Sequence, residues 1–278
     1  MNDNWTPPTI PVEPALTPAG ALRFLLRGTA LAMVTFGSLV LLLLLRLVER
    51  PLWGMRRPWT PHITQFVCRS AFVILGMKHS VRGQQMVHNG AMVANHVSWL
   101  DIFTLNAGKR IYFVAKSEVA GWPGIGLLAR ATGTLFIKRD RKEARAQKEL
   151  LEARLHAGHK MLFFPEGTST DGVRVLPFKS TLFAAFFSDT LRDNLYVQPV
   201  SVVYRSPEGE GQTYYGWWSE MDFAPNLMRM LAAPRHGSVE VVYHAPLKVS
   251  DYSDRKDMAR DCERAVRSAM PGQDIALM

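Results

Sequence analysis

The sequence predicts an α/β fold: a mixed sheet flanked by helices, preceded by an N-terminal membrane-associated helix or two-helix hairpin. Two observations carry this prediction. After Lys78, short apolar runs alternate with helical stretches, which is typical of strand–helix–strand units. Before it, residues 28–45 read GTALAMVTFGSLVLLLLL and contain no charge. We therefore divide the chain into a loose tail (1–20), an anchoring region (21–78) and a main domain (79–278).

The uncharged segment has about the minimum length of a membrane-spanning helix. A buried core helix is the alternative, but such a helix seldom lacks a polar face throughout. Arginines stand on both sides and are more numerous after the segment, which favours a cytoplasmic main domain attached to the cytoplasmic membrane. Basic residues at both ends also leave a re-entrant hairpin open, with residues 62–77 as its second, interfacial helix.

The formal charge of +9 is typical of proteins that bind nucleic acid or an anionic membrane. The uncharged segment favours the membrane, and no glycine-rich phosphate loop, zinc pattern or RNA-binding motif supports nucleic acid. Cys68 and Cys262 lie far apart and lack a CxxC partner, which fits a reducing compartment. We therefore expect membrane lipids, and no nucleic acid, as partners.

The elements of the main domain follow in order along the chain. Residues 142–155 are the clearest helix, because Leu150, Leu151 and Leu155 form an apolar stripe opposite charged residues. Functional loops in such folds gather at strand ends. The expected strands are GAMVAN, RIYFVAK, TLFIKR, MLFFPEG, YVQPVSVVY and SVEVVYHAPL; the other expected helical stretches are WLDIFTLNAG, WPGIGLLARATG and FKSTLFAAFFSDT.

One strand-end loop reads NHVSWLD, residues 95–101. Ser98 and Asp101 match a helix capping box, so a purely structural role is one interpretation. In the other, Asp101 accepts the Nδ1–H of His96, fixes its tautomer and leaves Nε2 free as a base. Since no GxSxG-type nucleophile occurs, that base would act directly on a substrate hydroxyl.

NHVSWLD resembles the first motif of the glycerolipid acyltransferase family, in which His-x4-Asp is the catalytic pair. GTLFIKR (133–139), FPEGTS (164–169) and VQPVSV (197–202) resemble the second, third and fourth motifs, in the family's order. The resemblance implies acyl transfer from acyl-CoA or acyl-carrier protein to a lysolipid hydroxyl. It also implies that His96 is the general base and Asp101 its orienting partner, without an acyl-enzyme, a metal or a cofactor.

The third motif also bears on the acceptor. It usually reads FPEGTRS, and here Ser169 replaces the arginine, which is well suited to grip a phosphate. The segments 117–123, 167–183 and 217–225 resemble the family members that act on lyso-ornithine lipid, an acceptor without phosphate. A 1-acylglycerol-3-phosphate acceptor is the alternative, and Ser169 and Asp171 would then only shape a turn.

Several residues are predicted, through this resemblance, to contact substrate. The loop carboxylates would meet the ornithine ammonium, and its hydroxyl residues would hydrogen bond neutral groups. The arginine of the second motif would meet the acceptor carboxylate or a donor phosphate, and a lysine would lie near the acyl carbonyl; exposed basic surface is the alternative for both. The predicted residues are Glu166, Gly167, Thr168, Ser169, Asp171, Arg139 and Lys116.

The sequence also leaves two other functions open, a metal site and a non-catalytic role. His96, Asp101 and Glu166 are each possible metal ligands, but no HxH, HExxH or Cys/His cluster accompanies them. A non-catalytic basic membrane protein would have no use for a His96–Asp101 contact.

Overall fold

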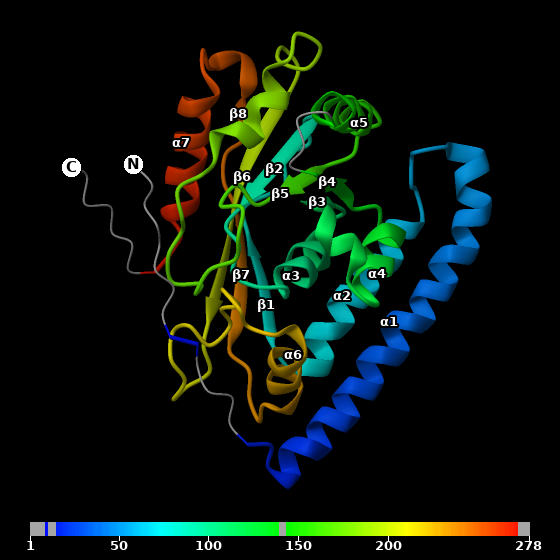
Figure 1. Ribbon diagram of the computed structural model, residues 1–278, viewed down its shortest axis with the longest axis vertical. Coiled ribbons are helices and arrows are strands. Elements are labelled where there is room, and N and C mark those ends of the chain that lie inside the picture. The colour runs from blue at the N-terminus through cyan, green and yellow to red at the C-terminus, as the bar shows by residue number, and fades with distance from the viewer. Residues whose placement is uncertain (1–8, 11–14, 139–142, 272–278) are drawn as a thin grey trace.

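The computed structural model describes residues 9–10, 15–138 and 143–271. The described residues form an eight-stranded sheet in the order β1-β7-β6-β2-β5-β3-β4, with β8 paired to β6 (Figure 1). The strands are β1 (Lys78–Arg82), β2 (Gly90–Ala94), β3 (Tyr112–Lys116), β4 (Leu135–Ile137), β5 (Met161–Phe163), β6 (Tyr196–Arg205), β7 (Ser238–Tyr243) and β8 (Leu247–Lys248). The helices are α1 (Pro18–Trp53), α2 (Thr60–Leu75), α3 (Asp101–Gly108), α4 (Ile125–Thr132), α5 (Ala144–His156), α6 (Phe223–Ala232) and α7 (Arg255–Arg267).

The sheet is mixed, as predicted. β2 pairs in parallel with β5 and β6, and β3 pairs in parallel with β5 and β4. β7 runs antiparallel to β6. Because β2, β5 and β6 run in parallel, the loops that follow β2 and β5 emerge at the same edge of the sheet, where functional groups of α/β folds gather.

Both faces of β2 are covered by helices, so all five of its residues are buried. Ala91 and Val93 belong to one apolar core, with residues of α5, α7 and the 3₁₀ helix Ser180–Phe187. Met92 and Ala94 belong to the other, with residues of α2, α3 and α6. In Figure 1, α7 and α2 lie on opposite sides of the sheet. This alternation follows from the two-residue repeat of a strand.

Helix α1 is longer than the uncharged segment predicted it to be. It starts at Pro18, where the Thr17 side chain accepts a hydrogen bond from Gly20 N, and includes Arg23, Arg27, Arg46 and Arg50. Its length and composition would allow it to cross a membrane, and only 11% of its most apolar window is buried. Helix α2 packs along it, so the two-helix arrangement is present. The outward apolar face of α1 supports membrane association.

Glu49 locks the turn between these two helices. Its side chain is fully buried, and it accepts hydrogen bonds from Trp59 N (2.8 Å), Thr60 N (3.1 Å) and Thr60 Oγ1 (2.7 Å). Arg46 Nη1 lies 2.9 Å from the same carboxylate. A carboxylate from α1 therefore supplies the polar cap that the first turn of α2 needs.

Some elements differ from the prediction. The helix expected at 142–155 is α5, Ala144–His156, but FKSTLFAAFFSDT forms a 3₁₀ helix. Strand β1 was not expected, because KHSVR is a polar edge strand without apolar alternation. Helix α7 was also missed, although its buried Met258, Cys262 and Val266 follow a helical period.

Candidate active site

The site is built where β2 ends. The last residue of β2, Ala94, pairs with Val200 of β6. Just beyond this pair, the Asn95 side chain continues the connection: its Nδ2 donates to Val202 O (2.9 Å) and its Oδ1 accepts from Val202 N (2.8 Å). This buried amide fixes the chain next to β6 at the point where His96 begins the loop.

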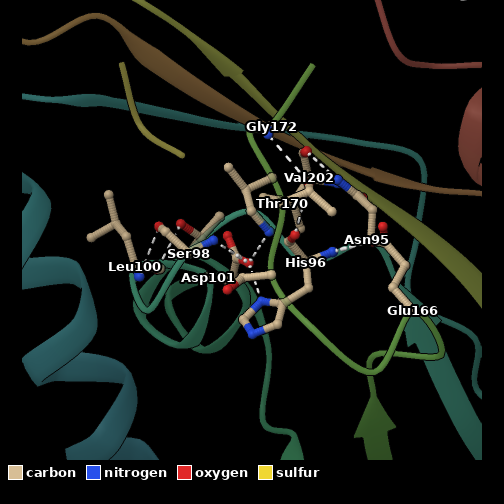
Figure 2. A network of polar contacts seen from close by, with 12 residues as sticks. Asn95, His96, Ser98, Leu100, Asp101, Glu166, Thr170, Gly172 and Val202 are labelled. Carbon is tan, nitrogen blue, oxygen red and sulfur yellow. Dashed lines mark hydrogen bonds and ion pairs between the residues drawn. The ribbon is translucent and has the colours of Figure 1, made fainter. Parts of the chain in front are cut away.

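His96 and Asp101 meet, as their spacing predicted. His96 Nδ1 lies 2.7 Å from Asp101 Oδ2 (Figure 2). The His96 side chain is 20% exposed, and its ring stacks on Phe164 at a centroid distance of 4.0 Å. Within the described part of the chain, His96 Nε2 forms no hydrogen bond. With Nδ1–H directed at the carboxylate, Nε2 carries the lone pair of a base.

Asp101 is held by more than the imidazole. Its side chain is fully buried, and Oδ2 also accepts from Val97 N (2.7 Å) and Ser98 N (3.1 Å). Ser98 Oγ accepts from Leu100 N (3.2 Å), so the capping residues seen in the sequence do bond locally. The structural and catalytic interpretations of Asp101 are therefore compatible, because one carboxylate organises the turn and meets His96.

A tyrosine that the sequence did not suggest completes this environment. Tyr204 Oη donates to Asp101 Oδ1 (2.8 Å), and the Thr104 hydroxyl lies 2.9 Å from the same Oη. Burial raises the pKa of Tyr204 well above its usual range, and the Asp101 charge adds to this, so the phenol stays protonated and donates. No local motif marks Tyr204, since it comes from β6, far along the chain.

The loop 164–172 clamps the backbone of His96 from both sides (Figure 2). Glu166 Oε1 accepts from His96 N at 2.7 Å. Thr170 donates to His96 O twice, from its backbone N (3.0 Å) and its Oγ1 (3.2 Å). Gly172, with φ +78°, closes the loop against Val97, where a Cβ would lie 2.7 Å from Cγ1. The loop thus sets the position of the imidazole.

The predicted contact of Glu166 with substrate is corrected by this geometry. Glu166 is 1% exposed, and its second oxygen, Oε2, accepts from Leu176 N at 2.7 Å. Both oxygens therefore bond to backbone inside the protein. Burial raises the pKa of Glu166 to about 8, opposed by the hydrogen bonds from Leu176 and His96. Through Oε1, Glu166 holds the backbone of His96.

Asp171 is corrected in the same way. It is 1% exposed, and Oδ1 accepts from Val173 N (3.0 Å) and Arg174 N (3.3 Å). Oδ2 forms an ion pair with Arg174 Nε at 2.9 Å. At 1% exposure, this carboxylate shapes the turn and is shielded from an ornithine ammonium.

The other predicted residues of the third-motif loop lie nearer to solvent. Thr168 is exposed and Ser169 is half-buried. Gly167 has φ +74°, and a Cβ there would lie 2.7 Å from Lys179 Nζ. The Lys179 ammonium therefore lies directly over this loop.

The two basic residues predicted to contact substrate have different outcomes. Lys116 ends β3 and its side chain is exposed. Arg139 lies outside the described residues. The contact predicted for each with substrate stays a prediction.

Helix α6 contacts the loop that carries His96 at Trp99. Trp99 Nε1 donates to Asn226 Oδ1 at 2.9 Å, and the Trp99 ring meets Phe223 edge-on at 5.4 Å. Sequence reasoning missed this contact because Trp99 and α6 are far apart in the chain. Among the described residues, no group of three or more His, Cys, Asp and Glu side chains is arranged to hold a metal.

Comparisons with known proteins indicate the family of this chain. A family model described as Acyltransferase matches residues 78–203. A lyso-ornithine lipid O-acyltransferase of Rhodobacter capsulatus is 57% identical over 266 residues, covering 96% of this chain and 96% of that protein. A protein of the same name from Brucella abortus is 34% identical over 240 residues, covering 80% of this chain and 88% of that protein.

A solved structure has the same fold. The crystal structure of the 1-acyl-sn-glycerophosphate acyltransferase from Thermotoga maritima aligns with 90% of this chain and 94% of that chain, with a TM-score of 0.62. Its sequence identity of 20% means that this likeness concerns the fold alone. On the family model and the curated relatives together, the chain belongs to the glycerolipid acyltransferase family and is an acyltransferase.

Proposed function

We propose that this enzyme transfers a fatty acyl group from an acyl thioester to the free hydroxyl of lyso-ornithine lipid, giving ornithine lipid. The observation that carries the proposal is the 2.7 Å contact of His96 Nδ1 with Asp101 Oδ2, which leaves Nε2 available as a base. The acyl donor is acyl-CoA or acyl-carrier protein.

In the proposed reaction, His96 Nε2 takes the proton of the acceptor hydroxyl while the hydroxyl oxygen attacks the thioester carbonyl carbon. The buried Asp101 carboxylate stabilises the imidazolium that forms. The tetrahedral intermediate then collapses, the C–S bond breaks, and the leaving thiolate takes the proton from Nε2. The acyl group moves directly from sulfur to oxygen, so the step needs neither an acyl-enzyme nor a metal or cofactor.

Two features of the third-motif loop support an acceptor without phosphate. Position 169 is a half-buried serine, where an arginine would suit a phosphate headgroup. The ammonium of Lys179 lies over Gly167, and as a compact point charge it suits the single carboxylate of ornithine. The names of the Rhodobacter and Brucella relatives support the same acceptor.

The ends of α1 support attachment to one side of the membrane. At its start, Arg23 Nε donates to Ala232 O (2.8 Å) and Arg27 Nη1 donates to Ala233 O (2.6 Å), at the end of α6. Just past its end, Arg57 Nη1 donates to Ala131 O of α4 at 2.8 Å. A helix that crossed the bilayer would place its ends on opposite sides. We therefore propose a re-entrant or in-plane anchor, with the catalytic domain on the cytoplasmic side.

The test of the acceptor is an acyl-transfer assay on the purified full-length protein. It compares lyso-ornithine lipid, its carboxyl methyl ester and 1-acylglycerol-3-phosphate, for wild type and Lys179→Gln. We expect wild type to have its highest kcat/KM with lyso-ornithine lipid and a lower kcat/KM with the methyl ester. Lys179→Gln should have the same kcat/KM as wild type with the methyl ester, because the carboxylate that Lys179 would contact is already removed. A wild type that prefers the phosphate acceptor would establish 1-acylglycerol-3-phosphate acyltransferase activity instead.

A further inference from the structure

A surface cavity lies away from His96, between the end of α2, the start of β1 and the end of α3. Its volume is about 470 Å³, within the range of small-ligand pockets. Ala107, on its wall, lies about 9 Å along α3 from Asp101 at 1.5 Å per residue. The charged, aromatic and larger apolar side chains that line the cavity are those of Arg69, Phe72, Val73, Met77, Lys78 and His79.

Two cations define one side of this cavity. Arg69 Nε donates to Ala107 O at 2.8 Å, which fixes the guanidinium and leaves its Nη groups for another partner. Lys78, at the start of β1, is exposed. Over the described ranges, neither side chain forms an ion pair, and no carboxylate lines the cavity. The cavity is therefore complementary to an anion.

His79 does not add a competing charge. Its Nε2 lies 2.9 Å from Thr104 O, and its ring packs on Phe72 at 4.9 Å. Burial lowers the pKa of His79, and the nearby Arg69 charge lowers it further, so the ring is neutral near pH 7 and donates to the carbonyl. The positive charge at the cavity comes from Arg69 and Lys78.

The other side of the cavity is apolar and continuous with the membrane-anchoring surface. Val73 is 80% exposed, and Phe66, seven residues earlier on the same face of α2, is 58% exposed. Exposed apolar residues of this kind mark a surface that meets another apolar phase. An occupant of the cavity thus meets two cations at one end and hydrocarbon at the other.

We propose that this cavity binds an anionic membrane phospholipid, with its phosphate against Arg69 and Lys78 and its acyl chains along Val73 and Phe66. The guanidinium suits a phosphate because it presents paired donors in a fixed plane. This lipid is distinct from the acyl acceptor, and the proposal does not depend on which acceptor the enzyme uses. The bound phospholipid would set how deeply α1 and α2 lie in the membrane and how they are oriented.

The experiment uses the full-length protein in neutral detergent and measures its Tm. The probes are dihexanoyl phosphatidylglycerol, dihexanoyl phosphatidylcholine and inorganic phosphate. The test variant is Arg69→Gln/Lys78→Gln. Its charge-matched control is Arg255→Gln/Lys256→Gln on α7, which lies on the opposite side of the sheet from α2 (Figure 1). A ligand that binds the folded state raises Tm with concentration.

We expect phosphatidylglycerol to raise the Tm of wild type and control, and phosphatidylcholine and inorganic phosphate to have little effect. The test variant should need at least tenfold more phosphatidylglycerol, since each cation near an anionic lipid is worth about fivefold in affinity. Its acyl transfer in neutral detergent should stay near wild type, which shows that it is folded.

Three results would overturn the proposal. If the test and control variants lose the same affinity for phosphatidylglycerol, only the overall charge of the protein matters. An equal Tm rise with inorganic phosphate would remove the role of the apolar wall. Lys78→Gln alone leaves the Arg69–Ala107 bond intact; if it folds and binds phosphatidylglycerol as wild type does, the site is not built as proposed.

Discussion

Tyr204 Oη donates a 2.8 Å hydrogen bond to Asp101 Oδ1, the carboxylate oxygen that does not meet His96. Among the described residues, Tyr204 is the hydrogen-bond donor to Asp101 Oδ1. Asp101 is fully buried, so an oxygen left without a donor would carry a desolvation penalty. Tyr204 therefore positions the carboxylate that orients the imidazole.

Tyr204→Phe removes this hydroxyl and keeps the ring. A hydrogen bond to a charged group contributes about 1.5–3 kcal/mol, so we expect kcat/KM to fall about 10- to 100-fold. The measurement is kcat/KM for lyso-ornithine lipid, with the Tm of the variant as the check that it folds.

Tyr215→Phe is the matched control. The Tyr215 ring lies 5.2 Å from that of Tyr204, but its hydroxyl accepts from Gly237 N (2.8 Å), away from Asp101. Its kcat/KM should match that of wild type. If kcat/KM falls equally in both variants, or in neither, Tyr204 has only a packing role.

Glu166→Gln tests the clamp on His96. Burial gives Glu166 a pKa of about 8 in the folded protein, against an ordinary value of 4.5. Between these values the folded state holds a proton that the unfolded chain has lost, so the free energy of unfolding falls as pH rises from about 4.5 to about 8. The side-chain amide of the Glu166→Gln variant does not titrate. Its NH₂ group would face one of the two backbone N–H groups, so one of the two hydrogen bonds of Glu166 is lost.

We expect wild type to be more stable than Glu166→Gln by about 1–3 kcal/mol at the low end of this range, and the difference to shrink toward pH 8. Urea unfolding in detergent at several pH values measures it. A difference that stays nearly constant up to pH 8 would mean that Glu166 is ionised throughout this range, held by its two backbone donors.

Ser169→Arg restores the residue that suits a phosphate. We expect kcat/KM to fall for lyso-ornithine lipid and to rise for 1-acylglycerol-3-phosphate, because the arginine gains a phosphate and repels the ornithine ammonium. Asp171→Asn is the control. Since Asp171 is buried against Arg174, kcat/KM should fall by a similar factor for both acceptors. An unchanged acceptor ratio in Ser169→Arg would show that position 169 does not select the acceptor.

The anchor is tested by labelling a cysteine placed beyond each end of α1. Cys68 and Cys262 are buried and give little background. With a membrane-impermeant thiol reagent, Ala15→Cys and Met55→Cys should both react in inverted vesicles and not in spheroplasts. Labelling of the two positions from opposite sides would show that α1 crosses the bilayer.

Local patterns in the sequence predicted much of this structure. The apolar run from Gly28 to Leu45 predicted α1, and the spacing of His96 and Asp101 predicted their contact. The capping pattern at Ser98 also appears as local hydrogen bonds. Each of these depends on residues near one another in the chain, where helix geometry and loop length limit the outcome.

What the sequence did not predict depends on long-range pairing. Tyr204 meets Asp101 only because β6 pairs with β2, and Trp99 meets Asn226 only because α6 packs against the loop before α3. The resemblance of FPEGTS to the third motif predicted that Glu166 contacts substrate. Its two backbone donors, His96 and Leu176, become visible only when the loop folds back onto β2.

The most direct test of the central claim is the rate of acyl transfer to lyso-ornithine lipid by His96→Ala. General-base catalysis contributes about 10²–10⁴-fold, so we expect a loss of at least 10²-fold in kcat. The Tm should change little, because the Glu166 and Thr170 bonds to His96 involve its backbone. A folded His96→Ala enzyme that retains near wild-type turnover would contradict the mechanism.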